Sequence, residues 1–368
     1  MSSSLPGSTR ARSSRQRVRL AAFALALGVL LVGGAAVVVA GLQSSLGPET
    51  QATSGVGLPS AAELGTLPEL PPQVRDSRAP LRPGFLRRDI DYVALGDSYS
   101  AGPGLAPQRS DPAECQRSGS NWPAYLAGWL DVSSYRDVTC AGATTGALLL
   151  DQPRPSGSMV PPQLQALSPE TDLVTVSLGG NDNALFMTLV GTCSELAQED
   201  PDGDPCRSTY SDDGSEARAL DEVPVHLAVV IRRIRLTAPG AQVVVVGYPQ
   251  IFPAGGTCDA VSLATGDVAW AAGVVESRNS AMESAARDEG VRFVDVADAS
   301  SGHDVCSDEP WVTGSEGAAG ATEPWHPGAT GMREVARIVA AQLTGSVVAD
   351  VVGPPDLADG VTQVNESS

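Results

Sequence analysis

The sequence contains no lysine, so all 24 of its basic residues are arginines, and they are outnumbered by 43 aspartates and glutamates. The formal net charge is −19 at pH 7. Such an excess of acid leaves no broad basic face, which argues against nucleic-acid binding and against electrostatic docking on anionic lipid. Histidine is scarce as well. His226, His303 and His326 are the only three, so any histidine-dependent chemistry has few candidate positions.

Long apolar runs are also rare, and the one that occurs lies near the N-terminus. Residues 20–42 carry no charged side chain, which matches the about 20 residues that a helix needs to cross a bilayer. Residues 1–19 carry five arginines and no acid, which predicts that they stay in the cytoplasm while the rest is exported. The length favours an uncleaved membrane anchor, because the apolar part of a signal peptide spans roughly 7–15 residues. The small residues 33–36 and Ala40 leave open the alternative of a cleaved signal peptide and therefore of secretion.

The composition divides the rest of the chain into three parts. Residues 43–88 are rich in Pro, Gly, Ser, Thr and Ala and read as a semi-extended linker. Residues 89–345 form the expected globular domain. Residues 346–368 form an acidic tail that we expect to be loosely held.

The six cysteines all follow the apolar run, and none forms a CxxC pair or a Cys/His cluster with zinc spacing. We therefore expect no metal site. An even number of cysteines in an exported chain points to disulfides. Spacing alone does not choose the pairing, but we favour the one that closes the shortest loops: Cys115–Cys140, Cys193–Cys206 and Cys258–Cys306.

Short apolar runs alternate with helical patterns through the domain. The runs are 91–95, 136–139, 172–178, 242–247 and 291–296, and the main helical patterns are 122–130, 222–236, 267–289 and 328–343. This alternation predicts an α/β fold in which helices cover both faces of a parallel sheet. The polar stretch 193–215 reads as a surface loop.

Three of these runs end in turns that carry glycine, at Gly96, Gly179 and Gly247. Because the carboxyl ends of parallel strands share one edge of the sheet, the three turns can converge on one pocket. Ser98 follows the first run and is a candidate nucleophile, provided that a base and oxyanion donors lie elsewhere in the chain.

Four short blocks supply those parts: Gly96-Asp97-Ser98-Tyr99-Ser100, Ala141-Gly142-Ala143-Thr144-Thr145, Gly179-Gly180-Asn181-Asp182 and Trp325-His326-Pro327. In this order they resemble the four sequence blocks of the SGNH (GDSL-type) hydrolases, and the resemblance covers roughly residues 89–345. It implies a three-layer α/β/α sandwich, the flavodoxin-like SGNH fold, behind one N-terminal transmembrane or signal helix.

The resemblance also assigns roles. Ser98 matches the nucleophile and His326 the general base. The backbone N–H groups of Ser98 and Gly142 and the side-chain amide of Asn181 match the oxyanion donors. These roles agree with the chemistry, because a serine hydroxyl needs a base to become nucleophilic and the resulting oxyanion needs fixed N–H donors.

The chain departs from the family pattern at the third catalytic position. The family usually has Asp three residues before the histidine, where this chain has Glu323. Two interpretations follow: the Glu323 side chain orients His326, or the main-chain carbonyl of Glu323 does so, as in secreted members with a Ser–His dyad.

The cysteine arrangement resembles the disulfide-bearing secreted branch that includes actinobacterial esterases, lipases and phospholipases, and the segment 302–306 supports the Cys258–Cys306 pairing. We therefore expect a monomeric serine esterase or lipase outside the cytoplasm, acting on lipid or small-molecule esters with no cofactor. A carbohydrate acetyl esterase acting on cell-surface glycans and a non-catalytic glycan- or lipid-binding module are the alternatives.

Overall fold

The structure, a computed structural model, describes residues 69–70, 76–78, 81, 89–317, 322–345 and 362–363, all within one compact unit, Ser54–Ser368. The predicted cytoplasmic segment 1–19 and apolar segment 20–42 lie outside these residues, as do most of the linker and the tail. Within the described ranges, no helix has both the length and the apolar character that a membrane crossing requires.

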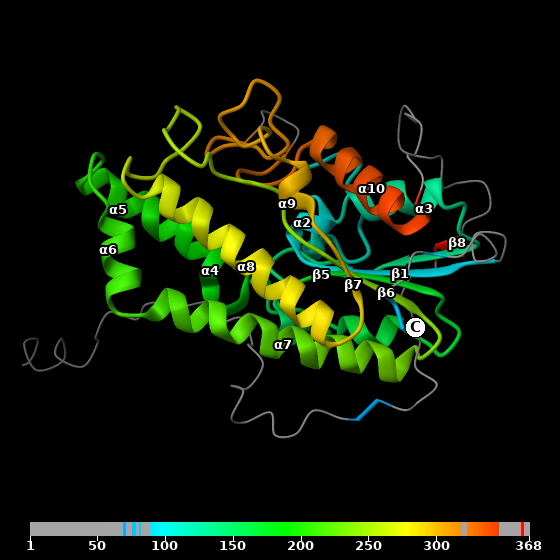
Figure 1. The fold of residues 1–368 in the computed structure, drawn as a ribbon. Coiled ribbons are helices and arrows are strands. Elements are labelled where there is room, and N and C mark those ends of the chain that lie inside the picture. The colour runs from blue at the N-terminus through cyan, green and yellow to red at the C-terminus, as the bar shows by residue number, and fades with distance from the viewer. Residues whose placement is uncertain are drawn as a thin grey trace, which may run out of the picture. The chain divides into compact units, whose positions relative to one another are not determined.

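Six parallel strands form the central sheet, in the order β7-β6-β5-β1-β2-β8 (Figure 1). They are β1 (Asp91–Gly96), β2 (Ser134–Asp137), β5 (Leu173–Ser177), β6 (Gln242–Val246), β7 (Arg292–Val294) and β8 (Thr362–Gln363). The predicted α/β class with a central parallel sheet is thereby confirmed. The order of the first five strands is that of the flavodoxin-like folds.

Helices cover both faces of this sheet, because its central strands are apolar on both sides. Val93 and Leu95 of β1 belong to a core with residues of α7 (Ser215–Thr237) and α8 (Val268–Asp288). Tyr92 and Ala94, which point the other way, belong to a second core with α3 (Trp122–Trp129) and α10 (Ala329–Thr344). Figure 1 shows the two helix pairs on opposite sides of the sheet.

The shorter elements occur mainly in the connections. The helices are α2 (Ser98–Ala101), α4 (Leu185–Met187), α5 (Cys193–Glu199), α6 (Pro205–Asp212) and α9 (Val296–Ala299), with short η turns at η2 (Ala113–Cys115), η3 (Thr145–Leu148), η4 (Gln163–Ala166), η5 (Asp182–Ala184) and η6 (Thr188–Thr192). An antiparallel hairpin pairs β3 (Gln152–Pro153) with β4 (Met159–Val160). Helices α5 and α6 replace the loop predicted for 193–215. Few of their residues are buried, so they lack the apolar periodicity that would have indicated a helix.

Ser77 and Leu81 of the predicted linker and β8 of the predicted tail pack on the domain. Ser77 is fully buried; its N–H donates to the Gly290 carbonyl at 3.2 Å and its Oγ accepts from Val243 N–H at 3.1 Å. Leu81 is buried as well. In the tail, β8 pairs with β2 in parallel. These contacts use main-chain groups, which a composition-based boundary does not detect.

Candidate active site

The predicted site residues follow neighbouring strands at one edge of the sheet. From β1 the chain continues to β2 on one side, whereas β5, the other neighbour of β1, leads to β6 in the opposite direction. Such a reversal in strand order is where open α/β sheets bind ligands, beyond the carboxyl ends of the strands. Ser98 follows β1, Gly142 follows β2 and Asn181 follows β5.

Ser98 is the first residue of α2 and is buried in a tight turn. Asp97 caps this helix by accepting a hydrogen bond from Tyr99 N–H at 2.9 Å. A Cβ on Gly96 would lie 2.6 Å from Ser100 Oγ, so only glycine fits there. The Gln163 side chain both donates to and accepts from the Gly96 main chain, at 2.9 Å each way. The Asp97 cap and the two Gln163 hydrogen bonds therefore fix the turn that presents Ser98.

His326 is buried, and its Nδ1 lies 2.7 Å from the Pro324 carbonyl oxygen. A carbonyl oxygen can only accept, so in the neutral ring Nδ1 carries the hydrogen and Nε2 keeps its lone pair. Burial lowers the pKa of His326, while the Pro324 carbonyl and the charge of Glu323 act in the opposite direction. The imidazole is therefore held neutral and able to accept a proton at Nε2.

The group bonded to the His326 ring is a main-chain carbonyl, as one of the two interpretations expected, but it belongs to Pro324 and not to Glu323. The Glu323 carboxylate accepts from Gln116 Nε2 at 2.5 Å, and the Glu323 carbonyl accepts from Thr313 Oγ1 at 2.8 Å. Trp325 adopts a φ of +63°, and the turn that it forms carries the Pro324 carbonyl to the imidazole. A positive φ at tryptophan cannot be foreseen from the sequence, because such residues rarely adopt it.

The segment that bears His326 is joined to the one that bears Ser98. The Tyr99 hydroxyl donates to the Trp325 carbonyl at 2.6 Å, and the Tyr99 ring lies 5.5 Å from the His326 ring. Phe186, from α4, contacts the same imidazole with ring centroids 5.7 Å apart. The first and last of the four sequence blocks therefore meet in the fold.

Gly142 lies in the turn 140–143, which is closed by the hydrogen bond from Ala143 N–H to the Cys140 carbonyl at 3.0 Å. Its φ of +73° is the left-handed conformation that this position of a type II turn requires and that favours glycine. Asn181 Nδ2 donates to the Ala143 carbonyl at 3.0 Å. The second and third blocks are therefore in direct contact.

Tyr248 belongs to this site, although the sequence argument assigned it no role. Its hydroxyl donates to Asp97 Oδ2 at 2.5 Å and accepts from Gly180 N–H at 2.9 Å. The guanidinium of Arg278 lies 3.9 Å above the Tyr248 ring. Burial raises the pKa of Asp97 to about 6, opposed by the hydrogen bond from Tyr248. Its position directly after β6, in one of the three glycine-bearing turns, was the available signal.

The other two histidines lie elsewhere. His226 is buried in α7, with Nδ1 3.5 Å from Asp182 Oδ2. That carboxylate also accepts from the N–H and the hydroxyl of Thr145, at 2.8 and 2.6 Å, so it braces the second block against the third. His303 stacks on Trp311 with ring centroids 4.9 Å apart.

Three disulfides join Cys115 to Cys140, Cys193 to Cys206 and Cys258 to Cys306, the pairs favoured from the sequence. Each of the six cysteines lies in a connection that follows the carboxyl end of a strand. Cys140 directly precedes the Ala141–Gly142 peptide, and Ala141 N–H donates to the Cys115 carbonyl at 3.0 Å. This disulfide therefore fixes the chain next to a predicted oxyanion donor.

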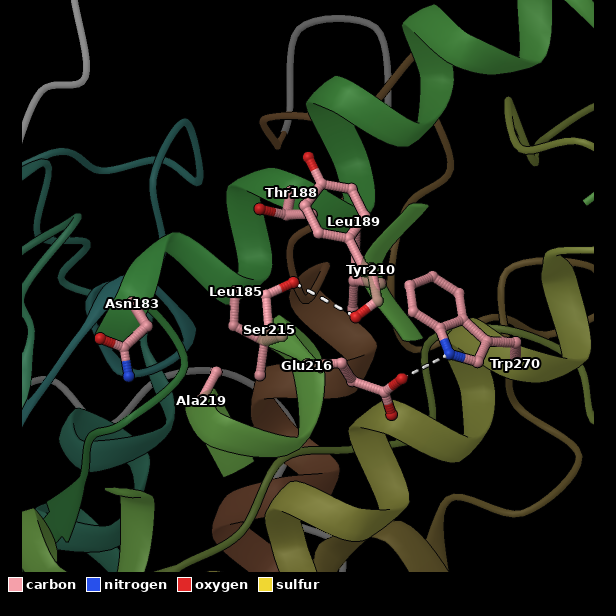
Figure 2. Close-up of a pocket in the computed structure, with 9 residues that line it drawn as sticks. All are labelled: Asn183, Leu185, Thr188, Leu189, Tyr210, Ser215, Glu216, Ala219 and Trp270. Carbon is pink, nitrogen blue, oxygen red and sulfur yellow. Dashed lines mark hydrogen bonds between the residues drawn. The ribbon is translucent and has the colours of Figure 1, made fainter. Parts of the chain in front are cut away.

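A largely apolar pocket lies beyond α4, among α6, α7 and α8 (Figure 2). Leu185, Leu189 and Ala219 line it, together with Trp270, whose indole N–H donates to Glu216 Oε2 at 2.8 Å. Leu185 of α4 lines this pocket, while the next residue, Phe186, packs on His326. None of the predicted site residues lines the pocket.

Comparison with known proteins identifies relatives of the whole domain. A family model described as the GDSL-like lipase/acylhydrolase family matches residues 94–334. Lipase 2 of Streptomyces coelicolor is 36% identical over 277 residues, covering 71% of this chain and 88% of that protein. An extracellular lipase from Streptomyces rimosus superposes with a TM-score of 0.57 at 30% identity, covering 69% of this chain and 99% of the other. A phospholipase A1 from Streptomyces albidoflavus gives 0.56 at 30% identity, covering 69% and 100%.

Proposed function

The chain belongs to the GDSL-like lipase/acylhydrolase family and is a hydrolase of ester bonds, and from this premise we propose that it acts through an acyl-Ser98 intermediate. His326 Nε2 takes the proton of the Ser98 hydroxyl as Oγ attacks the ester carbonyl carbon. The carbonyl oxygen becomes an oxyanion, which accepts hydrogen bonds from the N–H groups of Ser98 and Gly142 and from the Asn181 amide.

The second half of the reaction returns every group to its starting state. The tetrahedral intermediate collapses, the bond to the alcohol breaks, and the leaving alkoxide takes the proton from His326. Water then attacks the acyl-enzyme while His326 accepts its proton. The second intermediate releases the carboxylic acid as the proton returns to Ser98 Oγ.

We propose that this is a Ser–His dyad oriented by a main-chain carbonyl. The observation that carries the proposal is the 2.7 Å contact between His326 Nδ1 and the Pro324 carbonyl oxygen. That contact fixes the tautomer in which Nε2 accepts a proton, the role that an acidic side chain fills in a triad. Glu323 then acts on His326 only through its charge.

The substrate class that we propose is a carboxylic ester of lipid or small-molecule type, supported by the lipase and phospholipase names of the relatives. We also propose export from the cytoplasm, with the arginine-flanked residues 20–42 as the targeting segment. The three disulfides and the extracellular description of the S. rimosus lipase support this location. These relatives give no support to the carbohydrate esterase or the binding module.

The test combines active-site labelling with a substrate series. A fluorophosphonate probe should label the wild-type protein at Ser98 with one label per chain. A series of p-nitrophenyl esters from acetyl to palmitoyl should be hydrolysed by the wild type and not by Ser98→Ala. A folded wild-type protein that takes up no label, or a Ser98→Ala variant that keeps its activity, would contradict the proposed function.

A further inference from the structure

One main-chain carbonyl beside the candidate oxyanion site accepts two side-chain hydrogen bonds. Gln152 Nε2 donates to the Ala141 carbonyl at 3.0 Å, and Arg154 Nη1 donates to the same oxygen at 2.6 Å. Both side chains come from the β3–β4 hairpin, 11 and 13 residues after Ala141 along the chain. Neither residue belongs to any of the four family blocks.

The Ala141 carbonyl and the Gly142 N–H are two ends of the same peptide group. In a trans peptide these two bonds point in opposite directions. The donors of Gln152 and Arg154 therefore lie on the side away from the Gly142 N–H. Among the described residues, no acceptor is bonded to that N–H, so it is available to a ligand.

This peptide is the central one of the turn 140–143, and the turn does not fix its orientation by itself. With Gly142 at a φ of +73° the turn is of type II. Rotation of the central peptide by about 180° gives a type I turn, which places this residue near a φ of −90° and keeps the same closing hydrogen bond. Glycine accepts both conformations at little cost, so the choice must come from groups outside the turn.

The two orientations have opposite consequences for a developing oxyanion. In the observed one, the N–H faces away from the hairpin and can donate to it. In the rotated one, the Ala141 carbonyl oxygen would take the place of the N–H and repel the negative charge. The donors of Gln152 and Arg154 would then face the Gly142 N–H and have no acceptor. A buried donor that loses its partner costs about 1–3 kcal/mol. The hairpin therefore favours the orientation that can stabilise an oxyanion.

The hairpin is itself well fixed. Arg154 N–H donates to the Ser158 carbonyl at 3.0 Å, and Gly157 N–H donates to the Arg154 carbonyl at 2.8 Å. The second guanidinium nitrogen, Nη2, donates to the Glu114 carbonyl, next to Cys115. Gln152 is buried, with 8% of the residue's surface exposed. Both donors are therefore held in place before any substrate arrives.

We propose that Gln152 and Arg154 are positioning residues that hold the Ala141–Gly142 peptide in the orientation in which its N–H completes the oxyanion hole. This inference rests on the proposed function, because it takes Gly142 as an oxyanion donor. It adds that the donor is assembled by side chains outside the four blocks. Glycine at position 142 permits the required conformation, and the hairpin selects it.

Substitutions at two positions test the proposal from opposite sides. Gln152→Glu keeps the shape of the side chain but places a carboxylate oxygen against the Ala141 carbonyl, which should drive the peptide to rotate. Arg154→Met removes the second donor, and Arg154→Lys restores one. Arg292→Met is the matched control, because Arg292 also donates to two main-chain carbonyls, of Gln342 and Arg78, but lies in β7.

Each variant is measured for kcat and KM on p-nitrophenyl butyrate, with active sites counted by exhaustive fluorophosphonate labelling. The Ki of a trifluoromethyl ketone, which forms a hemiketal oxyanion on the serine, is measured as well. Loss of a whole oxyanion donor lowers kcat by about 10²–10³. For a misoriented donor we expect kcat per labelled site to fall about tenfold to a hundredfold in Gln152→Glu and Arg154→Met. KM should change little, Ki should rise by the same factor as kcat falls, and Arg154→Lys should recover part of the loss.

A purely structural role would lower the melting temperature and the number of labelled sites but leave kcat per site and Ki at wild-type values, which would overturn the proposal. So would a loss in Arg154→Met with none in Gln152→Glu, since that indicates a direct effect of the arginine charge. If Arg154→Met does not fold, the isosteric Gln152→Glu decides alone. A wild type without labelling would refute the proposed function instead, so the two failures are distinguishable.

Discussion

His326 is the residue on which the proposed chemistry depends most. It is 9% exposed and bonded at Nδ1 to a neutral carbonyl oxygen. A carboxylate in that place would stabilise the imidazolium strongly, whereas a carbonyl does so only weakly. Burial lowers the pKa of His326, and the weak opposing effect of the carbonyl does not offset it, so the base stays neutral in solutions where an exposed histidine is already charged.

We predict that kcat/KM falls on acidification through a pKa below the ordinary histidine value of about 6.5. The sign follows because only neutral His326 accepts a proton and burial favours the neutral form. A pH profile on a p-nitrophenyl ester measures the acid limb. Asp97, with a pKa of about 6, titrates nearby, and Asp97→Asn is the control: the limb should persist in that variant. An acid limb with a pKa above the ordinary histidine value of about 6.5 would contradict the prediction.

Glu323→Ala should lower kcat/KM by less than about tenfold, or 1.4 kcal/mol. The reason is that its carboxylate bonds to Gln116 and leaves the orientation of His326 to Pro324. Thr313→Val is the contrasting variant. Thr313 Oγ1 donates to the Glu323 carbonyl and accepts from His326 N–H, so its loss should loosen the histidine turn and reduce activity more. A larger loss of kcat/KM in Glu323→Ala than in Thr313→Val would instead indicate that the Glu323 side chain orients His326.

At the scale of elements, the turns that follow β1 and β5 are joined by one hydroxyl from the end of β6. Tyr248 donates to Asp97 beside the candidate nucleophile and accepts from Gly180 beside Asn181. A Cβ on Gly180 would lie 2.9 Å from this hydroxyl, so glycine lets the two turns approach. Three neighbouring strands thus contribute to the spacing of the proposed oxyanion donors.

Tyr248→Phe should therefore reduce both stability and catalysis. Removing the hydroxyl leaves a buried carboxylate oxygen and a buried N–H without a partner, at about 1–3 kcal/mol of unfolding free energy. We expect kcat to fall about tenfold as the donors move apart. Tyr92→Phe is the matched control, because its hydroxyl bonds Thr175 at 2.7 Å between the same two strands but within the sheet. It should lower stability and leave kcat unchanged; equal kcat values in the two variants would contradict this account.

How far the sequence predicts these elements depends on whether the signal is local. β6 was evident because Val243–Val246 are consecutive β-branched residues, and the four blocks predicted Ser98 and His326 as site residues through local motifs. Helices α5 and α6 were missed because they bury little apolar surface. The Pro324 carbonyl and the Gln152–Arg154 pair were missed for another reason: hydrogen bonds that side chains make to main-chain carbonyls leave no trace in residue spacing.

At the scale of the whole molecule, residues from the predicted linker complete the domain. The Ser77 carbonyl accepts from Gln242 Nε2 at 2.6 Å, and the Ser77 hydroxyl accepts from Val243 N–H. Both partners lie in β6, at its amino-terminal end, opposite the candidate active site. The folded unit therefore begins earlier in the chain than the composition shift at residue 88 indicated.

Ser77→Ala should lower the free energy of unfolding by about 1–3 kcal/mol, because the buried Val243 N–H loses its acceptor. Activity should remain at the wild-type level, since the contact lies at the far edge of the sheet. Urea denaturation with an esterase assay measures both quantities. Ser208→Ala, which removes an exposed hydroxyl from α6, is the control and should change neither. If the two variants have the same stability, the segment around Ser77 does not contribute to folding.

The position of the cysteines has a practical consequence for producing this enzyme. All six lie in connections between strands, so no disulfide cross-links the sheet itself, and one of them, Cys115–Cys140, adjoins the turn that carries Gly142. A chain synthesised in a thiol-rich host cytosol would lack all three cross-links, each of which typically stabilises a fold by about 2–4 kcal/mol. We therefore expect the reduced protein to be less stable and less active, so that reoxidation should raise both its melting temperature and its specific activity.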